Sequence, residues 1–166
     1  RLIDSSKISF KDVWKFSSLD NFTLIQSEDK KKFSKKDFRI VSKKKPSKSQ
    51  LDNLMFAFNV CRYVKSNAIV LASNKSTIGI GSGQPSRLDS CEIAINKMNK
   101  FSKINDEIVA ASDAFFPFVD GIEKLVQSGA TAIIQPAGSI RDKEIIKFAN
   151  ETNTVLVFSK TRHFRH

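Results

Sequence analysis

The stretch "AIVLASNKSTIGIGSG", residues 68–83, decides the fold class of this chain. Its first six residues are apolar and rich in branched side chains, and a run of this length predicts a strand buried on both faces. Residues 76–83 predict a hairpin partner that bends at its glycines. A strand that is covered on both faces needs helices on both sides of its sheet.

The segments around this hairpin predict those helices. Ser47 and Gln50 form a capping box, and the apolar spacing that follows predicts a helix to about Val64. Ser86 can cap a second helix, which would follow the hairpin directly. The remaining segments alternate, with strands predicted at 107–113, 130–136 and 154–159 and helices predicted at 120–129 and 139–150.

Single residues mark two of the helix ends. Gly129 would end the helix over 120–129, because glycine takes the left-handed conformation at little cost. Ser139 would open the helix over 139–150. The alternation of helices with short apolar strands predicts an α/β sandwich with a mixed sheet.

Residues 1–45 do not show this alternation of helices and strands. Residues 21–27 and 38–42 are rich in β-branched and aromatic side chains, with a lysine-rich turn between them, and we expect a hairpin or a neighbouring strand pair there. We therefore treat residues 1–166 as one domain, in which 1–45 is a strand-rich lead-in and 46–166 is the α/β core.

The composition argues against a secreted or membrane-spanning protein. Cys61 and Cys91 fall in apolar helical patterns, and no secretory signal is visible, so we expect buried thiols and a cytoplasmic protein. No apolar run approaches the roughly 20 residues of a membrane-spanning helix, so no membrane partner is expected. Because the first residue is Arg1 and not methionine, we expect the chain to be a piece of a longer protein.

The net charge of +11 suggests nucleic acid as a partner. Residues 1–66 hold 16 Lys/Arg against 7 Asp/Glu, whereas residues 67–166 hold 12 against 10. The excess comes mainly as lysine blocks, at 30–32 and 43–45, and scattered lysines act as solvated point charges. A solvated basic face is therefore favoured, and no nucleic-acid partner is expected.

Three loops could hold a ligand at strand ends, where open α/β sheets bind theirs. In "GIGSGQPSR" (79–87), the glycines, the helix start and Arg87 suit an anion, but the residues alone favour a glycine-rich hairpin end without a ligand. In "SDAFFPFVDG" (112–121), the phenylalanines are either filler beneath a loop or a stacking platform stiffened by Pro117. The turn "QPAGSIRD" (135–142) fits amide recognition or plain helix capping.

Both histidines lie in the terminal "RHFRH", residues 162–166. This end is either a frayed basic tail or part of a pocket. With two histidines and no C-x-x-C pair, the sequence offers no convincing zinc site, so no metal is expected.

Five blocks, "VKSNAIV", "GIGSGQPSRLDS", "SDAFFPF", "IIQPAGSIRD" and "RHFRH", resemble in order and spacing the carboxy-terminal part of the bifunctional purine biosynthesis family. In that family an aminoimidazole carboxamide ribonucleotide (AICAR) formyltransferase is joined to an IMP cyclohydrolase. The resemblance covers residues 51–166 closely and continues more loosely upstream in "LDNFTLIQ" and "FRIVSKKKP".

The resemblance implies a cytidine-deaminase-like α/β/α sandwich that lacks the deaminase zinc. It also implies transfer of a formyl group from the co-substrate 10-formyltetrahydrofolate to the amino group of AICAR, in a homodimer whose sites form between subunits. The AICAR site would hold Phe115, Arg162, Phe164 and His166, with Arg162 on the phosphate. The folate side would hold Asn67, Arg87, Leu88, Asp120, Ser139 and Ile140.

Two departures from the family pattern limit what this chain could do. The family's catalytic Lys-His pair has no counterpart here, so we expect no catalytic residue in the chain and little activity from it alone. Val119 stands where relatives commonly carry arginine. The alternative function is a non-catalytic module that binds a purine nucleotide.

Overall fold

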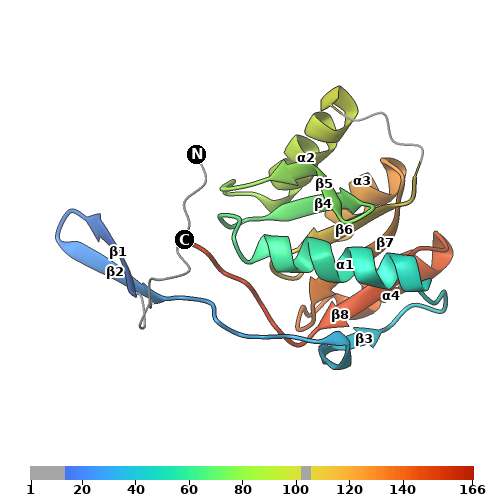
Figure 1. Cartoon of the computed structure of the whole chain (residues 1–166), viewed down its shortest axis with the longest axis horizontal. Coiled ribbons are helices and arrows are strands. Elements are labelled where there is room, and N and C mark those ends of the chain that lie inside the picture. Colours follow the sequence, from blue (N-terminus) through green and yellow to red (C-terminus); the bar gives the residue numbers. More distant parts are fainter. Residues whose placement is uncertain (1–13, 102–105) are drawn as a thin grey trace, which may run out of the picture. The chain divides into compact units, whose positions relative to one another are not determined.

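The computed structural model describes residues 14–101 and 106–166, and the chain divides into two units, residues 1–32 and 33–166. Figure 1 labels the helices and strands of both units. The second unit contains the larger sheet and the helices α1 to α4.

The larger sheet has six strands in the order β3-β8-β7-β6-β4-β5. Strands β6, β7 and β8 run parallel, whereas β4 and β5 pair antiparallel and so do β4 and β6, and β3 and β8. The predicted mixed sheet is therefore confirmed. The strands are β3 (Phe38–Ile40), β4 (Ile69–Ser73), β5 (Ser76–Gly81), β6 (Ile108–Ser112), β7 (Ala130–Pro136) and β8 (Val155–Ser159).

Helices cover both faces of this sheet. Helix α1 (Lys48–Cys61) packs on one face, and α2 (Arg87–Phe101), α3 (Asp120–Gln127) and α4 (Asp142–Glu151) pack on the other (Figure 1). Strands β4, β6, β7 and β8 are buried along nearly all of their length, as their apolar runs predict. The result is the α/β/α sandwich expected from the sequence.

Glycines bring α2 unusually close to the sheet. A Cβ atom on Gly81 would lie 1.8 Å from the carbonyl oxygen of Ser90, and one on Gly79 would lie 2.1 Å from that of Ala94. No side chain fits between the main chains of β5 and α2. The start of α2, where Arg87 lies, is therefore fixed against the end of β5 by main-chain contact.

The predicted helix caps at α1 and α2 are present. Ser47 Oγ accepts from the Gln50 amide at 3.0 Å, and the Gln50 side chain accepts from the Ser47 amide at 2.9 Å. Ser86 Oγ accepts from the Leu88 amide at 3.1 Å at the start of α2. These capping residues set both helix starts from local sequence alone.

The predicted pairing of residues 21–27 with 38–42 was wrong. In the first unit, β1 (Trp14–Leu19) pairs antiparallel with β2 (Phe22–Ser27), whereas β3 joins the edge of the larger sheet beside β8. The physical reason is loop closure, because the two-residue turn at Asp20 and Asn21 closes β1 on β2 at little entropic cost.

Both faces of the β1–β2 hairpin carry large apolar side chains. The strand register places three on each face, and every one is more than half exposed. They are Trp14, Phe16 and Ile25 on one face and Leu19, Phe22 and Leu24 on the other.

Helix α4 begins three residues later than predicted. Ser139 does not open it; instead the Asp142 carboxylate accepts hydrogen bonds from the amides of Gly138 and Ser139, at 2.9 and 3.2 Å. Gly138 takes a φ of +114°, which favours glycine. A carboxylate from within the turn thus occupies the amides that the sequence offered to a ligand, and the capping alternative describes this turn.

Candidate functional site

A pocket of about 460 Å³ opens where several segments of the second unit meet. It lies beside the start of β4, the end of β6 and the start of α2. The C-terminal tail forms part of its wall. Its lining comes from residues 85–88, 114–118 and 120–121, together with Asn67, Arg162 and Phe164. Two of the three predicted loops and the tail therefore meet at one site.

The C-terminal tail is fixed to the rest of the unit. The amide of His163 donates to the Asp113 carbonyl at 3.0 Å, and the Ser66 amide donates to the Arg165 carbonyl at 2.9 Å. The His163 side chain is 1% exposed, and its ring centroid lies 4.5 Å from that of Phe58. The frayed-tail alternative is therefore wrong, and the tail is a wall of the pocket.

Arg162 lies between two aromatic rings of the pocket. Its guanidinium carbon is 4.9 Å from the ring centroid of Phe115 and 4.9 Å from that of Phe164. Within residues 14–101 and 106–166, neither a hydrogen bond nor an ion pair engages this guanidinium. Two cation–π contacts thus hold a cation whose N–H groups remain available to a bound anion.

The other cation of the pocket, Arg87, is engaged by the protein. Its Nη1 forms an ion pair with the Asp113 carboxylate and donates to Ser112 Oγ at 2.9 Å, and its Nη2 donates to Asn67 Oδ1 at 2.8 Å. The Asp113 carboxylate also accepts from the Ser66 hydroxyl. The Arg87 and Asp113 side chains are 9% and 0% exposed, so this is a buried ion pair at the pocket wall.

The Asn67 side chain is fixed in one orientation. Its Nδ2 donates to the carbonyl oxygens of Gln84 and Pro85, at 2.9 and 3.1 Å, and its Oδ1 accepts from Arg87. Asn67 precedes β4, and the Ser66–Asn67 peptide bond is cis. The amide therefore lies between the loop after β5 and the start of α2.

Seven of the ten predicted site residues line this one pocket. They are Asn67, Arg87, Leu88, Phe115, Asp120, Arg162 and Phe164. The structure thus brings together residues that are up to 97 positions apart, between Asn67 and Phe164.

The other three predicted site residues lie outside the pocket lining. Ile140 is fully exposed, and the Ser139 amide donates to Asp142. The His166 ring stacks on that of Phe164, with centroids 5.8 Å apart. Their predicted roles remain predictions, although Arg141 lies over the Phe118 ring at 4.8 Å and so connects the turn at 138–141 with the pocket wall.

Sequence reasoning missed Asp113, its partner Ser66 and the Ser112 hydroxyl, which accepts from Arg87. The carboxylate touches both the Arg87 guanidinium and the Ser66 hydroxyl, although it is not part of the lining itself. One signal could have indicated it, because an aspartate directly after the apolar strand β6 is an ionisable group at a buried position that needs a partner.

The two cysteines are structural. Burial raises the pKa of the Cys91 thiol to about 12 and raises the pKa of Cys61 well above its usual value. Neither thiol is a nucleophile at neutral pH, because the thiolate is the reactive form. Within the described residues, no group of three or more His, Cys, Asp or Glu side chains could hold a metal ion.

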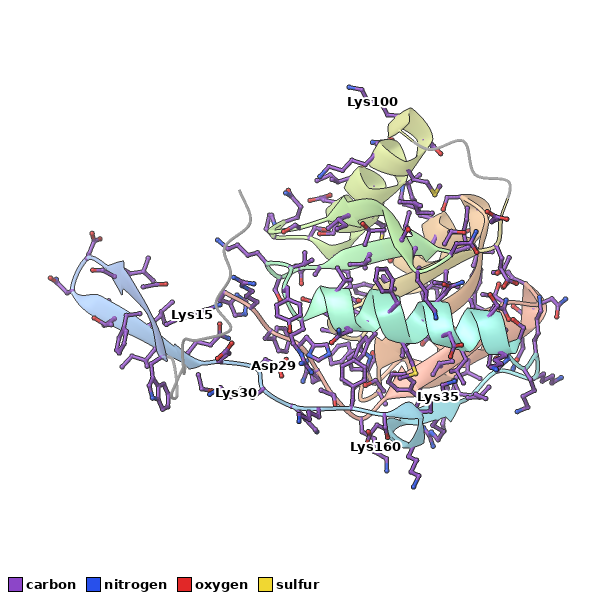
Figure 2. The ribbon with its side chains drawn as sticks, in the orientation of Figure 1. Lys15, Asp29, Lys30, Lys35, Lys100 and Lys160 are labelled. Atoms are coloured by element: carbon purple, nitrogen blue, oxygen red, sulfur yellow. The ribbon has the colours of Figure 1, made fainter. Side chains whose placement is uncertain are left out.

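The lysines of the second unit lie in more than one group on its surface, with Lys43, Lys143 and Lys147 around one hollow and Lys48 and Lys75 around another. Figure 2 shows Lys100 at the end of α2, far from Lys35 and Lys160. Lys35 Nζ is 2.7 Å from the Asp52 carboxylate, which has a lowered pKa because it accepts this hydrogen bond. Separately, none of the helices in 14–101 and 106–166 has the length and apolar character to cross a membrane.

Comparison with known proteins identifies the family. The model of the AICARFT/IMPCHase bienzyme family matches residues 1–97, more than half of the chain. The chain belongs to this family. Among the bienzyme relatives, the bifunctional purine biosynthesis protein PurH of Chlorobium chlorochromatii is 42% identical over all 166 residues, and PurH of Leptospira biflexa is 48% identical over 149.

The coverage of these relatives is partial. The match spans 100% of this chain and 32% of the Chlorobium protein, and 90% of this chain and 29% of the Leptospira protein. The chain thus spans about a third of the length of the curated relatives it matches. Among solved structures, a dCMP deaminase from the cyanophage S-TIM5 superposes with a TM-score of 0.44 at 15% identity, covering 68% of this chain and 98% of that one.

Proposed function

We propose that this bienzyme-family chain is the carboxy-terminal part of an AICAR formyltransferase domain, in a cytoplasmic protein that also carries IMP cyclohydrolase. The reaction would form a bond between the AICAR amino nitrogen and the formyl carbon of 10-formyltetrahydrofolate. The bond from that carbon to the folate nitrogen would break, and the proton lost by the amine would balance the one gained by the folate. The chain would serve de novo purine biosynthesis by binding these two substrates.

The position of Arg162 carries the proposal. A nucleotide offers a phosphate dianion and a planar base, and the pocket offers a cation next to aromatic rings. A guanidinium forms paired, charge-assisted hydrogen bonds with a phosphate. We therefore assign the AICAR phosphate to Arg162, and the rest of the nucleotide to Phe115, Phe164 and His166.

The folate co-substrate would occupy the other side of the pocket. Leu88 and Asp120 would face it, with Asn67 and Arg87 between it and the AICAR carboxamide. Ser139 and Ile140 belong to this proposal although they lie outside the pocket lining. They would complete the folate side if the site forms between the subunits of a homodimer, as the family resemblance implies.

Catalysis would need residues from outside this chain. His163 and His166 each follow an arginine, so the chain has no neighbouring Lys-His pair to assist loss of the amine proton. Val119 precedes α3 and packs against the apolar core, so it adds no charge where relatives commonly carry arginine. The chain would therefore bind and orient substrates.

Calorimetry and an activity assay on the full-length protein test the proposal together. We expect AICAR to bind and 10-formyltetrahydrofolate-dependent formylation to follow. Binding without formylation would favour the alternative, a non-catalytic module for a purine nucleotide, which the same Arg162 geometry supports. Absence of AICAR binding would overturn both functions.

A further inference from the structure

The pocket has two arginines in very different electrostatic states. The Arg162 guanidinium has two cation–π contacts but neither a hydrogen bond nor an ion pair among the described residues, whereas Arg87 is paired with the buried Asp113 carboxylate. An ion pair with so little exposure is weakly screened by solvent and salt. The charge of Arg87 is therefore cancelled within the protein, and the charge of Arg162 is not.

Although Asp113 neutralises the charge of Arg87, the guanidinium keeps N–H groups that could donate to a ligand. A guanidinium has five N–H donors, and the contacts to Asp113, Ser112 and Asn67 use three of them. The wall that Asn67 and Arg87 form is therefore polar without a net charge. Such a wall suits an uncharged hydrogen-bonding group better than an anion, because an anion would lose its hydration without meeting a net positive charge.

We propose that Asp113 is a specificity-determining residue that makes the Asn67–Arg87 wall select an uncharged group, such as a carboxamide, over a carboxylate. The proposal rests on the proposed function, which places the AICAR carboxamide at this wall. The phosphate would be directed to Arg162 because that is the pocket cation without a carboxylate partner among the described residues. Asp113 would act through Arg87 and not by contact with the ligand.

The main test compares two probes on the full-length protein. They are AICAR and its analogue with a carboxylate in place of the carboxamide, each measured by calorimetry, and the readout is the ratio of their dissociation constants. Asp113→Asn keeps the shape of the side chain and removes its charge, which leaves Arg87 positive. We expect the ratio to shift toward the carboxylate analogue by roughly 10- to 30-fold. This is the size expected when a ligand carboxylate interacts with the unpaired charge of Arg87 several ångströms away at an intermediate dielectric constant.

A matched control separates this effect from a general change of charge. Asp89→Asn is the same substitution in the first turn of α2, two residues from Arg87, at an exposed carboxylate outside the pocket lining. We expect this control to change the ratio by less than about twofold, because solvent screens an exposed charge. A shift in Asp89→Asn equal to that in Asp113→Asn would overturn the proposal.

A second variant reverses the sign of the expected effect. Asn67→Asp adds a carboxylate beside Arg87, gives the wall a net negative charge and should shift the ratio away from the carboxylate analogue. Opposite shifts in the two variants would not result from a loss of packing alone. If Asp113→Asn did not fold, as judged by circular dichroism, Asn67→Asp would decide the matter, and an unchanged or opposite ratio in it would refute the inference.

The outcomes also distinguish the two proposals. If the wild-type protein bound neither probe, the proposed function would fail. If it bound AICAR and Asp113→Asn kept the wild-type ratio, only the role of Asp113 would fail.

Discussion

The main-chain amide of His163 donates to the carbonyl oxygen of Asp113 at 3.0 Å, and this bond joins the C-terminal tail to the end of β6. The Asp113 side chain pairs with Arg87, which lines the pocket at the start of α2. One residue therefore contacts both the tail that carries Arg162 and the start of α2. The predictions below concern the pocket that these contacts form and the core beneath it.

Arg162→Ala should weaken AICAR binding by about 1.5–3 kcal/mol, because charged hydrogen bonds to the phosphate would be lost. Calorimetry on the full-length protein measures this. Arg39→Ala is the matched control, since Arg39 also lies over a phenylalanine ring, that of Phe158, but outside the pocket lining. Unchanged affinity in Arg162→Ala would refute the assignment of the phosphate.

Gly121→Ala should lower the free energy of unfolding of the protein. The added Cβ would lie 2.6 Å from Phe116 Cδ1, and the Phe116 side chain is 1% exposed and has little room to move. Overpacking of this kind typically costs about 1–3 kcal/mol. Chemical denaturation measures the loss, and AICAR affinity should fall as well because Phe116 and Gly121 both line the pocket. A variant with wild-type stability would show that Phe116 can shift freely.

Alkaline pH should destabilise the protein through its buried thiols. The folded pKa of Cys91 is about 12, above the ordinary value of about 8.5 in an unfolded chain. The stabilising contribution is therefore complete below pH 8.5 and is lost as the pH rises toward 12. Urea unfolding between pH 8 and 10 should show this loss, and Cys91→Ala should reduce the slope. An unchanged slope in that variant would contradict the prediction.

The 166-residue chain by itself should show little or no formyl transfer. It lacks the neighbouring Lys-His pair, and general acid–base catalysis typically contributes 10²- to 10⁴-fold to an enzymatic rate. A coupled assay with AICAR and 10-formyltetrahydrofolate measures this, with the full-length protein as the positive control. Turnover by the chain comparable to that of the full-length protein would contradict the proposed division of labour.

Retention on DNA should be weak at physiological salt. The lysines of the second unit are divided among separate parts of its surface, with Lys100 far from Lys35 and Lys160 (Figure 2), and an ion pair joins Lys35 to Asp52. Specific contact with many phosphates would give a steep fall of affinity with salt. Fluorescence anisotropy with a labelled duplex between 50 and 200 mM salt measures this. Tight binding with a steep salt slope would reinstate nucleic acid as a partner.

Local signals in the sequence predicted most of the α/β core. The capping box at Ser47 and Gln50, the cap at Ser86 and the glycine after α3 each depend on a few neighbouring residues, and each is present. Strand pairing at the front was mispredicted because β3 pairs with β8, which lies more than a hundred residues away. No local pattern specifies such a partner.

The sequence predicted most residues that line the pocket, but it did not predict which of their charges are neutralised by a partner. The resemblance placed Arg87 on the folate side and Arg162 on the nucleotide phosphate, and both line the pocket. Only the fold shows that Arg87 is neutralised, because Asp113 is 26 residues away in sequence and reaches Arg87 from the end of β6. For the amides at Gly138 and Ser139 the sequence left ligand binding and capping as alternatives, and the structure shows capping by a carboxylate three to four residues later.

The apolar hairpin of the first unit has a practical consequence for handling the protein. Six large apolar side chains that are more than half in contact with water favour self-association, and an isolated two-stranded hairpin has little stability of its own. Solutions of the 166-residue chain should therefore scatter light increasingly with concentration. A shorter polypeptide that starts at Phe33 should remain monodisperse, and it offers the better starting material for crystallisation and titration of the pocket.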